Sequence, residues 1–155
     1  MTPGILQAEQ ADISFQLHSH THDAASDSYG LEAAQKLEVD PGRVFKTLVV
    51  SLSDGKLAVA VVPVSSRLNL KALAKSLKVK MAGMAGADAV ERSTGYVLGG
   101  VSPLGQKKKL NTVIDDSARE QASIFISAGR RGLELELAPE DLLQLTRGRF
   151  AAISS

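Results

Sequence analysis

The chain has 155 residues, of which 44% are hydrophobic and 23% charged, and its formal net charge is +1 at pH 7. This length and composition argue against disorder and predict a single domain over residues 1–155 with a buried core. The absence of cysteine excludes disulfides, thiolate zinc sites and every cysteine-nucleophile mechanism. The near-neutral charge argues against a general nucleic-acid coat, although a local basic patch can still bind one RNA end.

The N-terminal segment predicts a short helix rather than a targeting signal. Thr2 is a typical helix N-cap and Pro3 suits a first helical turn. The stretch MTPGILQAEQ lacks the basic and apolar regions of a signal peptide, and no apolar run approaches the roughly 20 residues that span a bilayer. We therefore expect a cytoplasmic protein with no membrane partner.

The first half of the chain then alternates strands and helices. Residues 13–22, ISFQLHSHTH, alternate apolar and polar side chains as a half-buried strand does, and Ser28 could cap the next helix. Two apolar runs around the turn SDGK predict a hairpin over residues 44–64 at the centre of a sheet. Asn69 is placed to cap an amphipathic helix over residues 70–78.

The second half predicts shorter elements. They are a short helix or turn at 87–95, a strand from Tyr96 running into a Gly- and Lys-rich loop up to 109, strands at 110–115 and 123–127, a turn at 128–132, a strand at 133–137 and a helix at 138–146. Strands and helices do not alternate regularly, which argues against a doubly wound fold. We expect an α+β fold, with a mixed sheet or barrel and helices packed outside.

One lysine interrupts the first strand of the hairpin. In VFKTLVVSL, residues 44–52, Lys46 shares a strand face with Val44 and Leu48. A buried ammonium without a partner is costly, so the side chain either reaches solvent at a strand end or lines a cleft. We favour the cleft, where Lys46 would offer a charge and three donors to a phosphate, a carboxylate or an ester carbonyl.

The stretch GGVSPLGQKKK, residues 99–109, is typical of a loop that holds a ligand. Its adjacent glycines let backbone N–H groups approach closely, Pro103 stiffens it, and the lysines that follow would make the mouth of a cleft basic. Neither the P-loop pattern nor the serine-hydrolase elbow fits, because no Ser or Thr follows the lysine and Ser102 precedes a proline. A glycine-rich turn with solvated lysines remains the alternative.

The histidine-rich stretch HSHTH suggests metal binding only at first sight. His18, His20 and His22 would share one strand face, but the outer two lie roughly 13 Å apart in an extended chain, too far for one metal. A two-histidine site completed by Asp23 or Asp27 stays open. We expect no metal, and histidines that form hydrogen bonds in or beside a cleft.

Two further charged groups lie near the C-terminal end. Arg130 and Arg131 could bind a phosphate through their guanidinium groups or could simply be solvated. Glu134 and Glu136 share one strand face, which is either exposed to solvent or a wall of the same cleft as Lys46. The spacing leaves both alternatives open.

The motifs FKTL, STGYVLGGVSPLGQKKK and SAGRRGLELELAPEDLLQL, in this order, resemble the YbaK proteins. These are bacterial Cys-tRNA(Pro) deacylases, members of the superfamily that includes the editing domain of bacterial prolyl-tRNA synthetases. The resemblance covers nearly the whole chain. It implies a mixed, barrel-like β-sheet flanked by helices, and hydrolysis of the ester that links cysteine to proline tRNA, without a cofactor.

The resemblance also implies roles for individual residues. Lys46 matches the lysine that orients the charged 3′ end, and residues 99–103 match a GxxxP loop whose amides hold the ester carbonyl. His20 stands where a tyrosine occurs in the family, so its role is open. The predicted site comprises Lys46, Gly99, Gly100, Val101 and Ser102 as catalytic residues, His20, Tyr29, Thr47, Pro103 and Glu136 as substrate-binding residues, and Lys107, Lys108, Lys109, Arg130 and Arg131 as tRNA-binding residues.

The sequence offers no nucleophile of its own, and the family is thought to let the thiol of the substrate attack its own ester. The expected partners are the acceptor end of tRNA(Pro) and, as a candidate docking partner, prolyl-tRNA synthetase. A pocket sized for cysteine also admits alanine, but alanine has no thiol. Two alternatives remain: a deacylase for another small amino acid such as alanine, and a non-catalytic module that binds a tRNA acceptor end or an acidic peptide.

Overall fold

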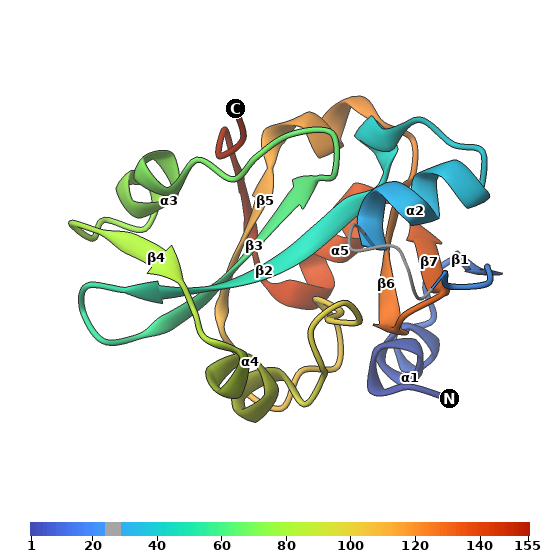
Figure 1. Ribbon diagram of the computed structural model, residues 1–155, viewed down its shortest axis with the longest axis horizontal. Helices are drawn as coiled ribbons and strands as arrows, with labels where there is room; N and C mark the ends of the chain where they lie inside the picture. Colours follow the sequence, from blue (N-terminus) through green and yellow to red (C-terminus); the bar gives the residue numbers. More distant parts are fainter. Residues whose placement is uncertain (24–28) are drawn as a thin grey trace.

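The computed structural model describes residues 1–23 and 29–155 (Figure 1). Its helices are α1 (Pro3–Gln10), α2 (Tyr29–Lys36), α3 (Leu70–Ser76), α4 (Ala87–Thr94) and α5 (Pro139–Thr146), with 3-10 turns η1 (Pro41–Arg43) and η2 (Asp116–Glu120). Its strands are β1 (Phe15–Ser19), β2 (Phe45–Leu52), β3 (Leu57–Pro63), β4 (Ala82–Met84), β5 (Asn111–Asp115), β6 (Ile124–Arg130), β7 (Leu133–Leu137) and β8 (Arg149–Ala151). The predicted α+β class is confirmed. In the described stretches, no helix has the length and apolar character needed to cross a membrane.

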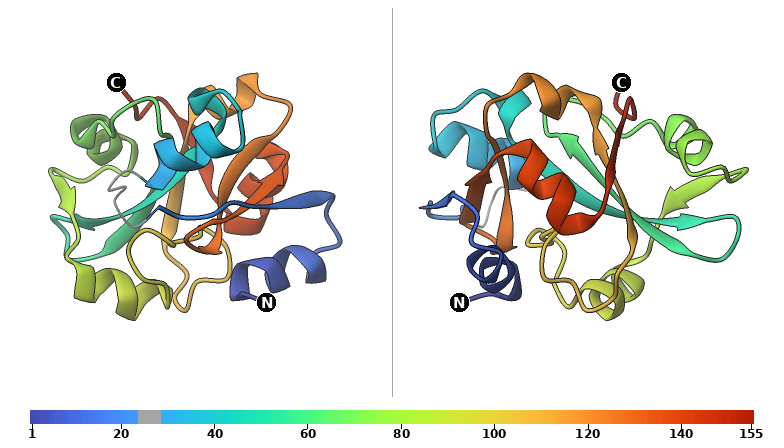
Figure 2. Two further views of the ribbon diagram at one scale, coloured as in Figure 1. Left: turned by 45° about the vertical axis from the view of Figure 1, so that its right-hand side comes forward. Right: turned by 180° about the vertical axis from the view of Figure 1, so that it is seen from behind.

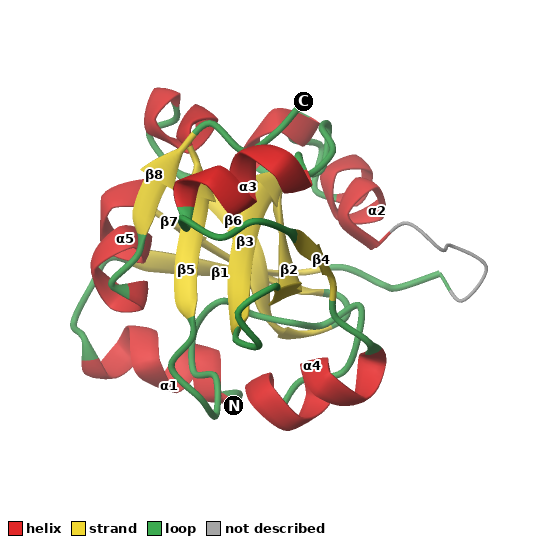
Figure 3. Ribbon diagram, turned by 90° about the vertical axis from the view of Figure 1, so that its left-hand side faces the viewer, coloured by secondary structure: helices red, strands yellow, loops and turns green. Residues whose placement is uncertain are grey.

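The strands form two sheets, with the helices arranged around them (Figure 3). The larger sheet has the order β4-β2-β3-β5-β8, in which β2, β3 and β4 pair antiparallel while β5 pairs parallel with both β3 and β8. The smaller sheet, β1-β7-β6, is antiparallel throughout. The mixed sheet expected from the sequence is therefore present, but it stays open and does not close into a barrel.

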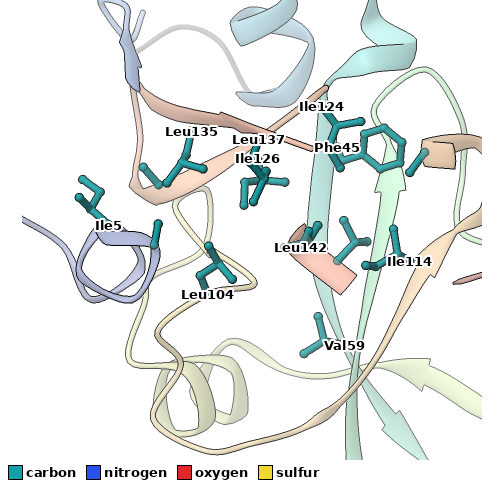
Figure 4. Close-up of a cluster of buried hydrophobic side chains, with 14 of the residues drawn as sticks. Ile5, Phe45, Val59, Leu104, Ile114, Ile124, Ile126, Leu135, Leu137 and Leu142 are labelled. Atoms are coloured by element: carbon teal, nitrogen blue, oxygen red, sulfur yellow. The ribbon is translucent and has the colours of Figure 1, made fainter. Parts of the chain in front are cut away.

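The main hydrophobic core lies between the two sheets (Figure 4). Phe45, Val59 and Ile114 of the larger sheet meet Ile126 and Leu135 of the smaller one, and all five are buried. Seen from behind, α5 lies between the two sheets, where its Leu142 joins the same core (Figure 2). Since burying one such aliphatic side chain contributes about 1.5–3 kcal/mol, this cluster holds the sheets together.

Strand β3 is buried on both faces. Its Val59 and Val61 face the main core, whereas Ala58, Ala60 and Val62 pack on the opposite side against α3. This arrangement explains why LAVAVVP is an uninterrupted apolar run, and it places β2 and β3 at the centre as the sequence predicts.

The helix caps follow the sequence. The Thr2 hydroxyl accepts a hydrogen bond from the Ile5 amide at 3.2 Å, and the Asn69 side chain accepts one from the Ala72 amide at 3.0 Å. Pro139 begins α5. The predicted cap at Ser28 lies outside the described residues.

Residues 96–110 differ from the prediction, because the strand expected from Tyr96 is absent and the next strand begins at Asn111. Gly95, Gly99 and Gly105 adopt positive φ angles of 84°, 90° and 67°, which no strand accommodates. The chain instead forms a loop closed by the Tyr96 hydroxyl, which donates to the Leu104 carbonyl at 2.6 Å. The prediction of a strand here is wrong.

The turn after β6 is also shorter than expected. Strand β6 continues to Arg130 through a bulge between Ser127 and Arg130, so the reversal before β7 is confined to Arg131 and Gly132. A glycine fits at position 132, where φ is 82°. The short edge strands β4 and β8 were not expected from the sequence.

The first half of β2 has an edge that β4 does not cover, and the cavity described below lies at this edge. Strand β4 pairs only with residues 50–52 of β2, which leaves the first half of β2 beside the smaller sheet. A parallel bridge between Val44 and Phe125 of β6 joins the sheets at the start of this edge.

Candidate active site

A cavity of about 180 Å³ lies where the open edge of β2 meets the turn between β6 and β7. Among the described residues, its walls come from residues 20–22, residues 29–32, residues 44–48, the loop at 98–101 and residues 127–134. The polar and charged residues that line it are His20, His22, Tyr29, Glu32, Lys46, Thr47, Ser127, Arg130, Arg131 and Glu134. Segments far apart in the sequence thus contribute functional groups to one cavity.

Lys46 lies on β2 opposite Val62 of β3, and its side chain lines the cavity. Burial lowers the pKa of its ammonium group, and the positive charge of Arg67 lowers this pKa further. No hydrogen bond or ion pair joins Lys46 to another residue in the described part of the chain. The structure therefore favours the cleft over the solvated strand end as the environment of this lysine, and its three donors are available to a ligand.

Two buried polar atoms beside Lys46 also lack partners. The hydroxyl oxygen of Thr47 and Nδ1 of His20 are inaccessible to solvent and form no hydrogen bond with the described residues. Both residues line the cavity. A buried polar atom without a partner is destabilising, so its presence at a cavity is typical of a site that pairs it with a ligand.

The loop after Tyr96 faces the cavity with its backbone. Gly99 and Val101 line the cavity, and their amides form no hydrogen bond with the described residues. The Leu98 carbonyl, by contrast, accepts a hydrogen bond from Nη2 of Arg131 at 2.9 Å. Two backbone donors at the cavity wall can hold a carbonyl oxygen or an oxyanion.

Gly99 is the residue that allows this loop to pack closely against Arg131 and Tyr29. Its φ is +90°, and an added Cβ would lie 2.5 Å from Nε of Arg131 and 2.7 Å from the Tyr29 ring. The Arg131 guanidinium stacks on Tyr29, with Cζ at 4.4 Å from the ring centroid. A side chain at position 99 would therefore disrupt the wall formed by these two residues.

The other predicted loop residues point elsewhere. The Gly100 amide donates to the Val97 carbonyl at 3.0 Å, and an added Cβ on Gly100 would meet the backbone of Arg130, so this glycine allows close packing. Ser102 is buried, and its hydroxyl accepts from the Leu104 amide at 3.2 Å. Pro103 lines a different groove. The cavity lining therefore does not include Gly100, Ser102 or Pro103, contrary to the expectation from the sequence.

Of the two glutamates on β7, the cavity contains Glu134 and not Glu136. Burial raises the pKa of Glu134 to about 8, so its carboxyl group is mainly neutral at pH 7. Glu136 instead binds His18 at 2.9 Å and Arg43 at 3.4 Å, and it accepts a hydrogen bond from Ser123. Although burial alone would raise the pKa of Glu136, these hydrogen bonds and charges lower it. Since side chains on one strand face are spaced about 7 Å apart, the two glutamates reach different environments.

His22 and Glu32 line the cavity as a pair. Nδ1 of His22 lies 2.7 Å from Oε1 of Glu32, and the His22 ring packs against Tyr29 with centroids 5.1 Å apart. The sequence predicted histidines beside a cleft, but nothing in it singled out Glu32, which is buried on α2. Ser127, whose hydroxyl accepts from the Gly129 amide, was likewise not marked by any motif.

A family model described as the aminoacyl-tRNA editing domain matches residues 24–145. The chain belongs to this family. The editing domain is 43% identical over 122 residues to a protein of Enterococcus faecalis provisionally named Cys-tRNA(Pro)/Cys-tRNA(Cys) deacylase EbsC, a match that spans 79% of this chain and 74% of EbsC. The resemblance to the YbaK proteins is confirmed.

Solved structures share the architecture of the editing domain. The crystal structure of hypothetical protein APE2540 has a TM-score of 0.89 and 25% identity, covering 99% of this chain and 100% of that one. A candidate trans-editing enzyme for prolyl-tRNA synthetase has a TM-score of 0.85 and 22% identity, covering 100% of this chain and 99% of that one. The open pair of sheets described above is thus the fold of these structures.

The basic residues predicted to bind tRNA lie in two places. Arg130 and Arg131 line the cavity. Lys108 and Lys109 instead line a second groove, together with Arg147 and residues of α1, and Lys107 packs its methylene groups over Gly95. The sequence had suggested that this lysine run lies at the mouth of the cavity. The structure instead places the run away from the cavity lining.

The histidines of the editing domain do not gather around a metal position. Among the residues that the structure describes, no three His, Cys, Asp or Glu side chains are grouped so that they could hold a metal ion. His18 pairs with Glu136 and His22 with Glu32, while Nδ1 of His20 is buried without a partner among the described residues. Asp27, one of the two carboxylates considered as a ligand, lies outside the described residues.

Proposed function

We propose that this editing domain hydrolyses the ester bond of cysteine carried by proline tRNA, acting in trans in the cytoplasm as a single-domain aminoacyl-tRNA deacylase. Membership of the aminoacyl-tRNA editing family and the relationship to EbsC support the enzyme class. The observation that carries the proposal is the cavity that Lys46 lines together with Gly99 and Val101 of a GxxxP loop, whose amides form no hydrogen bond with the described residues.

The ester carbonyl is the group that these donors fit. The amides of Gly99 and Val101 would hold its oxygen, and they would bind it more tightly as negative charge develops there. The Lys46 ammonium would orient the 3′ end of the tRNA and add positive charge. Because these donors are fixed by the fold, little reorganisation is needed during the reaction.

The nucleophile would come from the substrate. The chain contains no cysteine, and no hydroxyl lining the cavity is hydrogen-bonded to a histidine among the described residues. A cysteinyl ester carries its own thiol, which can attack the ester carbon and release the tRNA 3′-oxygen. Discrimination against alanine would then come from chemistry, since size alone separates such side chains by only about 1–3 kcal/mol.

His20, Tyr29, Thr47 and Glu134 would surround the amino-acid part of the substrate. The unpaired Thr47 oxygen can accept a hydrogen bond from its ammonium group or thiol. Glu134 is mainly neutral in the empty cavity at pH 7, but a bound ammonium group would favour its ionised form. Thr47 and Glu134 would thus recognise the free amino group that distinguishes an aminoacyl ester from a peptidyl ester.

The acceptor end of tRNA(Pro) is the proposed partner, with prolyl-tRNA synthetase as the protein that would deliver it. Arg130 and Arg131 at the cavity would contact the terminal phosphates, and Lys107, Lys108 and Lys109 would contact the backbone further along. No cofactor or metal takes part in the proposed reaction.

A comparison of three esters tests the proposal. Proline tRNA charged with cysteine, alanine or proline is incubated with the protein, and the remaining ester is measured over time. We expect rapid loss of the cysteine ester, slow loss of the alanine ester and no loss of the proline ester. An unchanged lifetime of the cysteine ester would contradict the proposal, and equal hydrolysis of cysteine and alanine esters would replace it with a general small-residue deacylase.

Lys46→Ala separates an enzyme from a binding module. We expect this variant to lose about 10²-fold or more in turnover of the cysteine ester while its affinity for uncharged tRNA changes little, because most RNA contacts lie elsewhere. Turnover is measured as single-turnover hydrolysis of the cysteine ester, and affinity for uncharged tRNA is measured by fluorescence anisotropy. A wild-type protein that binds RNA without turnover would identify the module instead.

A further inference from the structure

A histidine–carboxylate pair lines the same cavity as Lys46. Nδ1 of His22 lies 2.7 Å from Oε1 of Glu32. The His22 side chain is 23% exposed, whereas that of Glu32 is only 5% exposed. The second ring nitrogen of His22, Nε2, forms no hydrogen bond with the described residues. The pair therefore presents one occupied and one available imidazole nitrogen at a cavity that both residues line.

Glu32 is fixed on its other side as well. Its Oε2 accepts a hydrogen bond from the Asp23 amide at 2.9 Å and lies 3.7 Å from the Lys36 ammonium. The hydrogen bond with His22 lowers the pKa of Glu32, so Glu32 is ionised. An ionised carboxylate only accepts, which places the proton of neutral His22 on Nδ1 and the lone pair on Nε2. The Tyr29 ring, 5.1 Å away, limits rotation of the imidazole.

We propose that His22 is the proton acceptor of the deacylation and that Glu32 is its positioning residue. This inference rests on the proposed function, which leaves open where the proton of the nucleophile goes. Nε2 takes the proton from the substrate thiol as sulfur bonds to the ester carbon. The C–O bond then breaks, the imidazolium returns the proton to the departing 3′-oxygen, and the products are a tRNA 3′-hydroxyl and a cysteine thiolactone that water opens. No redox change occurs, and one proton is passed on.

The other groups at the cavity suit this role less well. Glu134 keeps its own proton at pH 7, since burial raises its pKa to about 8. Nδ1 of His20 is buried without a carboxylate to orient the ring. The charged and titratable groups near the His22–Glu32 pair are Asp23, Tyr29 and Lys36, and the other such groups that line the cavity are His20, Lys46, Arg130, Arg131 and Glu134. His22 alone among the cavity groups in the described residues combines a basic nitrogen with a fixed carboxylate partner.

The chain offers a matched control. His18 lies on β1, four residues before His22, and also pairs with a carboxylate, since its Nε2 is 2.9 Å from Oε1 of Glu136. That pair does not line the cavity. His18→Ala and His22→Ala therefore remove the same chemical group and a comparable hydrogen bond to a carboxylate, but only the second removes a base from the cavity.

The experiment measures single-turnover hydrolysis of cysteinyl-tRNA(Pro) by the two variants, with and without added imidazole. We expect His22→Ala to lose about 10²–10⁴-fold in rate and to regain part of it as imidazole fills the vacated space, whereas His18→Ala keeps a rate within about threefold of the wild type. Glu32→Gln should lower the rate by about tenfold, leave KM unchanged and move the acid limb of the rate profile to lower pH, because the imidazolium loses its carboxylate partner.

Each result decides the inference. A His22→Ala variant with the wild-type rate overturns it, and so does a loss of rate that imidazole does not restore in a variant whose circular dichroism and unfolding midpoint match the wild type. If His22→Ala does not fold, the pH profile of Glu32→Gln decides, since a purely structural role would leave it unmoved. A wild-type protein inactive on the cysteine ester contradicts the proposed function itself, which keeps the two failures distinct.

Discussion

The side chain of Thr47, which lines the cavity, lowers the stability of the folded protein. Its buried hydroxyl oxygen has no partner among the described residues, although valine would fill the same volume without a polar atom. A buried polar group without a partner destabilises a protein by about 1–3 kcal/mol. Residues that reduce stability in this way are found where function requires them.

Thr47→Val should therefore stabilise the protein while weakening catalysis. We expect the free energy of unfolding in urea to rise by about 1 kcal/mol and the turnover of the cysteine ester to fall. Thr112→Val is the control, because the buried Thr112 hydroxyl donates to the Leu110 carbonyl at 3.1 Å and should lose stability on replacement. A destabilised Thr47→Val protein would show that the hydroxyl is already satisfied.

Glu134 should make the stability of the protein depend on pH. Its carboxyl keeps its proton up to about pH 8 in the folded state, whereas the unfolded chain releases it near the ordinary value of 4.5. Between these values the folded state binds more protons, so the free energy of unfolding falls as pH rises, by a few kcal/mol in total.

Glu134→Gln should remove this dependence, since the amide has a similar shape and does not titrate. We expect the variant to be more stable than the wild type at about pH 8 and nearly equal to it at about pH 5. Urea unfolding of both proteins across this range measures the difference. Parallel curves for the two proteins would show that Glu134 titrates normally.

At the scale of elements, the loop between α4 and β5 depends on Gly99. Gly55 in the β2–β3 turn has nearly the same backbone conformation, with φ +88° against +90°, but nothing lies within 4 Å of its added Cβ. The two positions therefore separate backbone strain from collision with the cavity wall.

Gly55→Ala should cost about 1 kcal/mol of stability and leave activity intact, because only the left-handed conformation is penalised. Gly99→Ala should cost more, about 2 kcal/mol or above, and lose most activity, since its Cβ would displace Arg131 and Tyr29. Urea unfolding and ester hydrolysis are measured for both variants. Equal losses in both variants would mean that the wall tolerates a side chain at position 99.

Elements with strong local signals could be predicted, and those fixed by distant contacts could not. The hairpin of β2 and β3 and the helix capped by Asn69 follow from apolar pattern and cap chemistry alone. The loop from Tyr96 was taken for a strand because its closure depends on a hydrogen bond to Leu104 and on glycine conformations that an apolar pattern does not encode.

In the candidate site too, residues with a local sequence signal could be predicted, and residues whose position depends on distant contacts could not. Lys46 and Thr47 were recognised through their place on a strand and through the family resemblance, and both line the cavity. Glu134 and Glu136 share a strand face, so only the neighbours of each in the folded chain distinguish them. Glu32 lies on a helix with no motif around it, and its role depends on the position of His22.

At the scale of the whole molecule, the basic residues predicted to bind tRNA lie on two surfaces, the cavity and the second groove, and an RNA that contacts both would have to extend from one to the other. Among the described residues, the second groove is lined by Lys108, Lys109 and Arg147 and by no acidic residue. A groove of this composition attracts phosphate groups, and such binding weakens as salt rises.

The double variant Lys108→Glu with Lys109→Glu should raise KM for cysteinyl-tRNA(Pro) by about tenfold or more at low salt and flatten its salt dependence. Its turnover of a cysteinyl ester of adenosine alone should be unchanged, because this short substrate does not reach the groove. Lys71→Glu with Lys75→Glu on the exposed side of α3 is the control. If KM for the full tRNA stays the same, the groove does not contact RNA.

Because the cavity lies where the two sheets meet, ligand binding there would stabilise the whole molecule. Lys46 belongs to the larger sheet and Glu134 to the smaller one, and near the cavity the sheets meet at the bridge between Val44 and Phe125. An aminoacyl group seated between Lys46 and Glu134 would tie the two halves together, and its binding energy would add to their cohesion. The protein with an aminoacyl group bound would then have a higher Tm than the empty protein, and release of the product would remove this stabilisation of the contact between the two sheets.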